Sequence, residues 1–265
     1  MCIRICGILI TLIGIAGLVV PFMPSILLII VGLLMTFSGR YHMIRKMLPE
    51  KIPAFAAYFY NAVPAKFFTP HYAIVAGEMD LRPGQTLLDL GTGPGLLPIQ
   101  IAQRFPGAHV IGIDLSEKMI ELAYKHLRDT KYDIRNTTLE FKVMDANKLA
   151  FGDESIDVIV STGAFHHWKN PAQIFDEIYR CLKRGGAAFI YDGYAGASDE
   201  AIDSGIKRLF WILPTHSMVR AILSIHGFTK AEYETRIRDM VSKSPFGSHF
   251  SIEYPGVLAK ISLKK

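Results

Sequence analysis

The sequence predicts an α/β protein built on a doubly wound, mostly parallel sheet, and three observations carry this prediction. From residue 73 onward, short apolar runs of strand length alternate with segments whose apolar residues recur at helical spacing. A glycine-rich turn, Gly91 to Gly95, follows the first of these runs. Two further strand-like runs flank Pro255-Gly256 near the end of the chain and predict an antiparallel hairpin there.

The expected elements follow one another with short connections. Helices are expected at 73–79, 96–105, 117–128, 171–182 and 231–242, and 198–224 is mostly helical. Strands are expected at 87–90, 109–113, 139–144, 158–161, 187–191, 249–254 and 257–263. Because strands that alternate with helices at this spacing form parallel sheets covered on both faces, we expect residues 73–265 to be one domain with a seven-stranded sheet.

A long apolar run precedes this domain. Residues 5–39 contain no charged side chain and no histidine. As one straight helix the run would be roughly 50 Å long, whereas the apolar core of a bilayer is about 30 Å thick. Pro21 and Pro24 divide it into two shorter arms. We therefore expect residues 1–40 to form a transmembrane hairpin. A single kinked span is the alternative, and a secretory signal fits less well because the run is too long.

Basic residues follow the apolar run directly, at Arg40, Arg45 and Lys46. Positive charge beside a membrane span is typical of the cytoplasmic side. We therefore expect a membrane-anchored protein whose C-terminal domain faces the cytoplasm.

Residues 41–72 form a connector that Pro49, Pro53, Pro64 and Pro70 punctuate. Its apolar residues recur every three or four positions, which is typical of short helices lying in the headgroup region of a membrane. Ordinary helices packed on the domain would show the same pattern, so both interpretations stay open.

Composition gives no support to two classes of function, nucleic-acid binding and cysteine-based metal binding. Residues 1–75 contain six Lys or Arg and one acid, whereas residues 76–265 contain 23 basic and 23 acidic residues. Because the second part is formally neutral, the sequence does not predict nucleic-acid binding. The three cysteines, Cys2, Cys6 and Cys181, form neither a disulfide framework nor a metal-ligand pattern, and no metal site is expected.

The glycine turn has the spacing Asp89-x-Gly91-x-Gly93-x-Gly95. A phosphate-binding P-loop would end in Gly-Lys-Ser/Thr, and a dinucleotide-binding turn would have glycine where Leu96 stands. The turn instead resembles the first motif of the class I S-adenosylmethionine-dependent methyltransferases. This resemblance implies a Rossmann-like, seven-stranded sheet that ends in an antiparallel hairpin, with S-adenosylmethionine as the cofactor.

The next two strands end in acidic residues. Asp114, at the end of VIGID, is placed to accept hydrogen bonds from both hydroxyls of a ribose. That feature alone does not separate S-adenosylmethionine from NAD. The third strand ends in VMDAN, and the resemblance implies that Asp145 accepts a hydrogen bond from the adenine amino group, with Ala146 beside it.

The fourth strand and its loop read IDVIVSTGAFHHWKNP. This segment resembles the fourth motif of the same family, and its His-His-Trp ending is similar to the branch that methylates quinone precursors, the ubiquinone/menaquinone type. Ser161 and Thr162 would then pass beside the methionine part of the cofactor. His166 and His167 are the best candidates to orient or deprotonate a substrate, because histidine titrates near neutral pH.

The resemblance also implies a full cofactor-binding set. Its members are Asp89, Gly91, Thr92, Gly93, Gly95, Asp114, Leu115, Met119, Asp145, Ala146, Ser161 and Thr162.

The leading hypothesis is a membrane-anchored methyltransferase that acts on a small lipophilic acceptor, such as a quinone precursor or a lipid headgroup. A membrane-tethered scaffold that binds the cofactor without catalysis is the first alternative. A nicotinamide-dependent reductase is the second, and Leu96 and the terminal hairpin disfavour it. The oligomeric state is left open.

Overall fold

The computed structural model describes residues 49–53, 57, 64–129, 137–207 and 216–265. The expected transmembrane hairpin at 1–40, and residues 41–48 of the expected connector, lie outside the described residues. Within the described part of the chain, no helix combines the length and the apolar character needed to cross a membrane.

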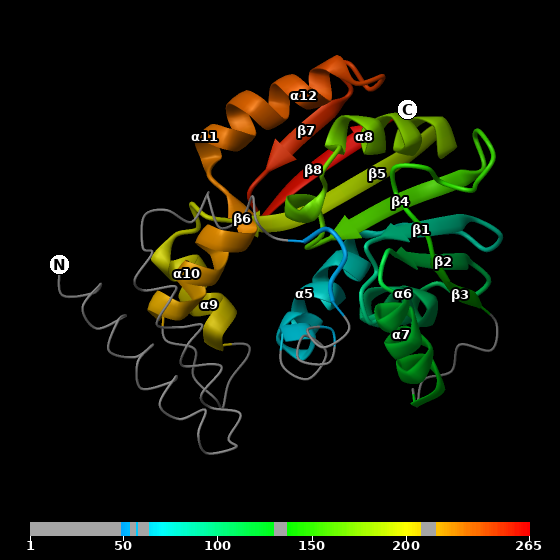
Figure 1. Cartoon of the computed structure of the whole chain (residues 1–265), viewed down its shortest axis with the longest axis horizontal. Helices are drawn as coiled ribbons and strands as arrows, with labels where there is room; N and C mark the ends of the chain where they lie inside the picture. Colours follow the sequence, from blue (N-terminus) through cyan, green and yellow to red (C-terminus); the bar gives the residue numbers. More distant parts are fainter. Residues whose placement is uncertain (1–48, 54–56, 58–63, 130–136, 208–215) are drawn as a thin grey trace.

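One sheet organises the molecule, with its strands in the order β3-β2-β1-β4-β5-β8-β7 (Figure 1). The strands are β1 (Thr86–Leu90), β2 (His109–Asp114), β3 (Thr138–Val143), β4 (Ile156–Thr162), β5 (Leu182–Tyr194), β6 (Gly227–Phe228), β7 (Phe250–Glu253) and β8 (Leu258–Lys264). Strands β1 to β5 pair in parallel, whereas β8 is antiparallel to both β5 and β7. The predicted parallel sheet and its antiparallel terminal hairpin are confirmed.

The two-residue strand β6 was not predicted from the sequence. It pairs in parallel with the end of β5, at Gly193 and Tyr194. The two backbones approach so closely that a Cβ added to Gly227 would lie 2.6 Å from the Gly193 carbonyl carbon, so only glycine fits there. This pairing brings the preceding helix against the carboxyl end of β5.

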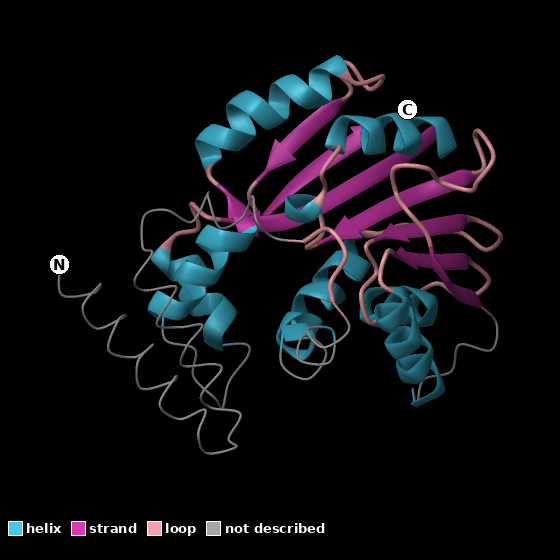
Figure 2. Cartoon of the chain, in the orientation of Figure 1, coloured by secondary structure: helices cyan, strands magenta, loops and turns pink. Residues whose placement is uncertain are grey.

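Helices cover both faces of the sheet (Figure 2). They are α5 (Pro64–Glu78), α6 (Leu96–Arg104), α7 (Glu117–Asp129), the 3-10 turn η1 (Phe165–His167), α8 (Pro171–Cys181), α9 (Asp199–Lys207), α10 (His216–His226), α11 (Lys230–Glu232), the π-helical turn η2 (Tyr233–Ile237) and α12 (Arg238–Lys243). The group α5, α6 and α7 lies on one face, and α8 and α12 lie on the other. The predicted doubly wound arrangement is therefore present.

The core consists of two apolar layers, one on each face of the sheet. Leu88 and Leu90 of β1 pack into the layer beneath α8 and α12, whereas Leu87 packs into the layer beneath α5 and α6. All three side chains are fully buried. Burial on both faces explains why the central strands read as continuous apolar runs rather than as alternating patterns.

Helix α5 starts nine residues earlier than the sequence predicted, at Pro64 rather than at Ala73. Both Pro64 and Pro70 were interpreted as helix breakers, and both lie within the helix. Pro64 is the first helical residue, where its missing N–H costs nothing. Pro70 removes one interior hydrogen bond, but the helix packs closely on α6 through Tyr72 and Val75, and this tertiary contact outweighs the local penalty.

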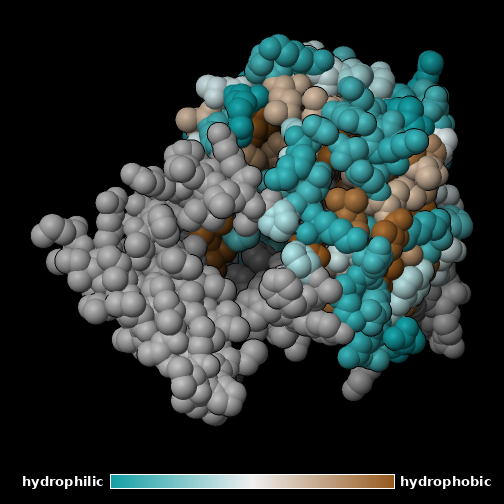
Figure 3. Space-filling view, in the orientation of Figure 1, coloured by the Kyte–Doolittle hydropathy of each residue, from teal (hydrophilic) through white to brown (hydrophobic). Residues whose placement is uncertain are grey.

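In the view of Figure 3, the described part of the molecular surface is mostly hydrophilic, with separate apolar patches. The large apolar side chains that are exposed among the described residues, Ile74, Tyr124 and Val143, come from three different elements. They do not by themselves define a docking surface.

Phe175 of α8 tests the packing of the larger core layer. Its side chain is fully buried, and its ring centroid lies 6.1 Å from that of Phe165 and 6.0 Å from that of Trp168. We expect Phe175→Ala to lower the free energy of unfolding by about 3–5 kcal/mol, because it leaves a cavity. Val143→Ala, at a side chain that is 49% exposed, serves as control and should change it by less than about 0.5 kcal/mol. Denaturant titration of the purified protein measures both, and equal effects would contradict this core assignment.

Candidate functional site

The candidate site lies at the carboxyl ends of β1, β2, β4 and β5. Strands β1 and β4 are neighbours in the sheet although β2 and β3 separate them in the sequence. The chain therefore reverses its direction of winding between them. In open parallel sheets ligands bind at such a point, just beyond the strand ends.

The glycine turn is fastened to the end of β2 by backbone hydrogen bonds. The N–H groups of Gly91 and Thr92 donate to the carbonyl of Ile113 over 2.9 and 2.8 Å. Gly95 then precedes α6 as its cap residue, in the left-handed conformation with φ 77°. The turn is thus rigid and ends at a helix N-terminus, which favours polar ligand groups.

The middle of the turn is open on one side. Gly93 has φ +53°, and a Cβ added there would meet no other atom within 4 Å. A side chain at this position would be strained and would fill the space above the loop. The turn therefore forms a bare backbone surface against which a ligand can lie.

Asp114 connects the turn to the second strand. Its Oδ2 accepts a hydrogen bond from the Gly93 N–H over 3.0 Å, and its Oδ1 accepts one from the Ser116 N–H over 2.8 Å. Burial raises the pKa of this carboxyl, and the two backbone hydrogen bonds oppose that shift. Each oxygen keeps a further lone pair, so the carboxylate can still accept from two ligand hydroxyls.

Asp89 is the other acid of the glycine turn region, and unlike Asp114 it is fully buried. It is 2% exposed, and its Oδ1 has no hydrogen-bond partner. Burial raises its pKa to about 7, with the nearby charge of Asp114 adding to the effect and the Thr92 hydroxyl opposing it. A buried carboxylate oxygen that lacks a donor is costly, and a cationic or hydrogen-bonding ligand would relieve that cost.

The other predicted cofactor residues differ in what their side chains do. Ser161 is fully buried, and its hydroxyl donates to the Leu90 carbonyl over 2.8 Å, which ties β4 to β1. The hydroxyl oxygen of Thr162 is buried and has no partner. Asp145 is exposed and accepts from the backbone and side-chain nitrogens of Asn147, each over 2.8 Å.

Three further predicted residues surround this group. Ala146 and Leu115 are half-buried at the ends of β3 and β2. Met119 is fully buried and packs against Ala57 and Leu122. The Met119 side chain therefore connects α7 to Ala57, in the part of the chain that precedes α5. The predicted cofactor contacts of all these residues stay predictions.

A short N-terminal segment, 49–53, joins the two flanks of the site; Figure 1 draws it in blue. The Ser116 hydroxyl, after β2, donates to the Ile52 carbonyl over 3.2 Å. The Lys169 N–H, after η1, donates to the carboxylate of Glu50 over 3.2 Å. The segment thus bridges the loops that follow β2 and β4.

A histidine cluster occupies the β4 and β5 side. The carboxylate of Asp192, at the end of β5, accepts hydrogen bonds from the backbone N–H and from Nδ1 of His166, over 2.7 and 2.8 Å. His167 follows in η1, with its ring centroid 4.1 Å from that of His166. The structure therefore places both predicted catalytic histidines beside Asp192.

His226 completes this cluster and was missed in the sequence. Its Nδ1 lies 3.0 Å from Nε2 of His166. Burial lowers the pKa of His226 to about 3 and that of His167 to about 4, and their proximity to His166 adds to both shifts. His226 lies 60 residues beyond His166, at the end of α10 just before β6, and no sequence motif marks it.

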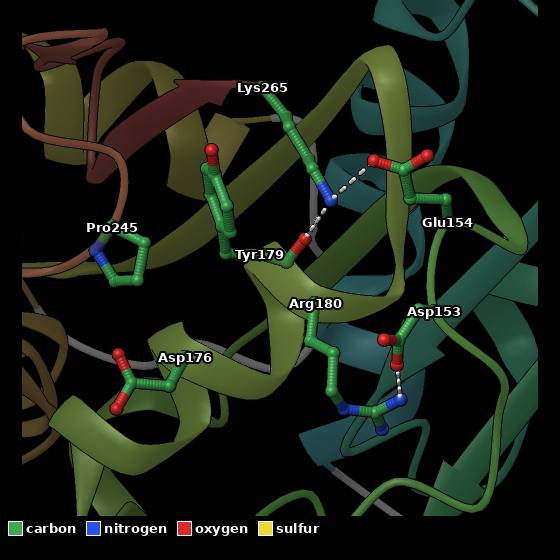
Figure 4. A pocket seen from close by; sticks show the side chains of 7 residues that line it. All are labelled: Asp153, Glu154, Asp176, Tyr179, Arg180, Pro245 and Lys265. Atoms are coloured by element: carbon green, nitrogen blue, oxygen red, sulfur yellow. Dashed lines mark hydrogen bonds and ion pairs between the residues drawn. The ribbon is translucent and has the colours of Figure 1, made fainter.

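A second depression lies at the opposite edge of the sheet, between α8 and the C-terminal residue (Figure 4). Four of the charged groups that line it form two pairs, Arg180 with Asp153 and Lys265 with Glu154. Arg180 donates to Asp153 over 2.8 Å, and Nζ of Lys265 lies 3.5 Å from Glu154 and 2.9 Å from the Tyr179 carbonyl. These contacts join the end of α8 and the residue after β8 to the loop before β4, at the edge of the sheet opposite the site.

The comparisons with known proteins agree with this geometry. The family model of a methyltransferase domain matches residues 88–190, the stretch that runs from β1 into β5 and carries the glycine turn, Asp114 and the histidine loop. The chain contains a class I, S-adenosylmethionine-dependent methyltransferase domain.

Curated relatives of this methyltransferase domain include two named enzymes. Phosphoethanolamine N-methyltransferase 2 of Caenorhabditis elegans is 36% identical over 158 residues, which cover 58% of this chain and 35% of the relative. Arsenite methyltransferase of Halobacterium salinarum is 35% identical over 113 residues, which cover 42% of this chain and 28% of the relative. The match thus spans about a third of the length of these relatives.

Solved structures share the fold. A putative S-adenosylmethionine-dependent methyltransferase of Methanococcus maripaludis superposes with a TM-score of 0.59 at 23% identity, covering 80% of this chain and 93% of the other. Phosphoethanolamine N-methyltransferase 2 of Haemonchus contortus, in complex with phosphomonomethylethanolamine and S-adenosylhomocysteine, gives 0.53 at 23% identity, covering 76% and 44%.

The residues of the methyltransferase domain fit S-adenosylmethionine. The open space above Gly93 would receive the cofactor beside the turn, and the Asp114 carboxylate would hold its ribose hydroxyls. The unpartnered oxygens of Asp89 and Thr162 supply acceptors for its amino group or its positive charge.

Asp114 tests the ribose contact. We expect Asp114→Ala to weaken the binding of S-adenosylhomocysteine by about 100-fold, because two charge-assisted hydrogen bonds and the anchor of Gly93 are lost together. Glu121→Gln, at a side chain of α7 that is 67% exposed, should leave the affinity unchanged. Isothermal titration calorimetry measures both, and full affinity in Asp114→Ala would refute the assignment.

Asp89 tests the electrostatics of the site. Its pKa is about 7 in the folded chain and 3.8 ordinarily, so the folded state retains a proton that the unfolded state loses. Between pH 4 and pH 7 this group therefore makes the protein less stable as the pH rises. Asp89→Asn removes the effect, so we expect the unfolding free energy of the variant relative to wild type to rise by about 2–4 kcal/mol from pH 4 to pH 8.

Asp239→Asn is the matched control, because that side chain is 61% exposed. Its difference from wild type should vary little across the same range. Denaturant titrations at several pH values give both curves. A difference between Asp89→Asn and wild type that stays constant with pH would contradict a protonated, buried Asp89.

Proposed function

We propose that the protein is a membrane-anchored enzyme that transfers a methyl group from S-adenosylmethionine to a small lipophilic acceptor, such as a quinone precursor or a lipid headgroup. The observation that carries the catalytic part is the coincidence of the family match with the bare turn and the Asp114 anchor. The anchoring rests on the charge-free run at residues 5–39, followed by basic residues.

Two kinds of similarity support the choice of acceptor. The His-His-Trp loop, His166 to Trp168, is similar to that of the quinone-precursor branch. The named relatives include several phosphoethanolamine N-methyltransferases, and phosphoethanolamine carries the same chemical groups as a phospholipid headgroup. An acceptor confined to the membrane would meet a tethered domain far more often than a free one.

The chain contributes position and shielding to the reaction. S-adenosylmethionine supplies a methyl group on a sulfonium, whose departure leaves a neutral thioether. The turn from Gly91 to Gly95 and Asp114 would hold the cofactor in one place, and segment 49–53 would restrict water at the site. His166, whose Nδ1 contacts Asp192, or His167 beside it would orient the acceptor or take its proton.

The experiment is incubation of the full chain in liposomes with methyl-labelled S-adenosylmethionine and a membrane extract. We expect a labelled lipid-soluble product, identified by mass spectrometry, and release of S-adenosylhomocysteine. Cofactor binding without any labelled product would favour the non-catalytic scaffold instead.

Deletion of residues 1–40 tests the role of the anchor. We expect the deletion to leave S-adenosylhomocysteine affinity unchanged, because the described cofactor site lies wholly outside the deleted part. Turnover of an acceptor embedded in liposomes should fall by about tenfold or more, since tethering raises the effective concentration. Unchanged turnover on liposomes, with a detergent-dispersed acceptor as control, would argue against a membrane-confined acceptor.

A further inference from the structure

We infer that His166, His167 and His226 form a binding site for one divalent transition metal ion of the Zn²⁺ type. Each residue offers one ring nitrogen, and these three atoms all lie within 4.8 Å of one another. The rings come from two elements far apart in the sequence, η1 and the end of α10.

The spacing suits imidazole coordination. Nε2 of His166 and Nδ1 of His226 are 3.0 Å apart. Four-coordinate zinc with Zn–N bonds of about 2.0–2.1 Å places its nitrogen ligands about 3.3 Å from one another. Small side-chain rotations therefore convert the observed cluster into a ligand set, with the His226–His166 hydrogen bond exchanged for two metal bonds.

Asp192 fixes the orientation of the central ligand. Its carboxylate, 2% exposed, accepts the Nδ1 proton of His166 over 2.8 Å, which leaves the lone pair of Nε2 directed at His226. Asp192 is itself held by the backbone N–H groups of His166 and Gly193. A carboxylate behind a coordinating histidine is the usual outer support of such sites, because it fixes the tautomer and raises the basicity of the ring.

His167 also has a ring nitrogen that is available for coordination. Nδ1 of His167 is buried and has no hydrogen-bond partner, while a hydrogen bond to the Pro49 carbonyl engages the ring. A metal ion would satisfy the orphaned nitrogen, whose burial is otherwise costly.

The donor set indicates the class of metal. Three neutral imidazoles suit Zn²⁺, Co²⁺, Ni²⁺ or Cu²⁺, whereas Mg²⁺ and Ca²⁺ require oxygen ligands. Three protein ligands leave at least one coordination position open, as in catalytic rather than structural zinc sites. The site lies at the same edge of the sheet as the cofactor residues, since η1 follows Thr162 by three residues.

The open position provides a place for a donor atom of the acceptor. This part rests on the proposed function. An acceptor hydroxyl or thiol bound there would lose its proton to solvent at a lower pH than in free solution, because the ion stabilises the resulting anion. The anionic oxygen or sulfur would then take the methyl group, and the cofactor would leave as S-adenosylhomocysteine.

Titration of the chelator-treated full chain with Co²⁺, followed by its visible absorption, tests the site. We expect one Co²⁺ per chain, displaced by Zn²⁺ and not by Mg²⁺. His167→Gln and His226→Gln should each weaken binding by about 100-fold, and Asp192→Asn by about 10- to 100-fold. His109→Gln, at an exposed histidine at the start of β2, is the matched control and should bind as wild type does.

Absence of Co²⁺ binding by the wild-type chain, or equal binding by the wild type and His167→Gln, would overturn the inference and leave a metal-free hydrogen-bonded cluster. His167→Gln is the deciding variant if His226→Gln fails to fold, because His167 is half-buried and lies in a short 3-10 turn. Circular dichroism and S-adenosylhomocysteine affinity verify its folding.

The same preparation separates this inference from the proposed function. Binding of S-adenosylhomocysteine without Co²⁺ binding refutes the metal site alone. Co²⁺ binding without S-adenosylhomocysteine binding supports the metal site and refutes the methyl-transfer function.

Discussion

The arrangement of the site depends on the hydrogen bonds that the Asp114 carboxylate accepts from Gly93 and Ser116. They join the turn after β1 to the turn after β2, so one half-buried acid holds together the two turns of the candidate cofactor site. The backbone carbonyl of Ile113, next to Asp114, accepts hydrogen bonds from the Gly91 and Thr92 N–H groups of the same turn. Asp114 is also the expected ribose ligand, so the carboxylate that joins the two turns is the one that would bind the ribose hydroxyls. A substitution there acts on both at once.

Asp89 and Asp114 are two acids close together, and their mutual repulsion is a free-energy cost that a cationic ligand would reduce. Asp114 adds to the burial that raises the pKa of Asp89, and one oxygen of Asp89 lacks any donor. In the low dielectric of the interior such a pair favours an added positive charge. A sulfonium nucleoside carries that charge. By this argument the pair of acids would favour a positively charged occupant over a neutral one.

The local parts of this architecture were predictable, and the long-range ones were not. Apolar strand runs and the glycine turn identified β1, β2 and Asp114, since these depend on neighbours in the sequence. Helix α5 began earlier than expected because packing on α6 outweighed the local penalty of Pro70. His226 was not predictable because the contacts of α10 and β6 with β5, which join distant parts of the sequence, bring it to His166. A strand so short has no periodicity to read.

The bridge formed by residues 49–53 has a kinetic consequence. Its contacts with the flanking loops include the hydrogen bonds that Ile52 and Glu50 accept from Ser116 and Lys169. The Pro49 carbonyl accepts a further one from His167, and Lys51 forms an exposed ion pair with Glu117. Each is weak on its own, so the bridge can detach without unfolding the sheet beneath it. The rate at which S-adenosylhomocysteine is exchanged for S-adenosylmethionine would then be set by this detachment rather than by rearrangement of the strands. Whatever holds the chain upstream of residue 49 would tune that release rate from a distance.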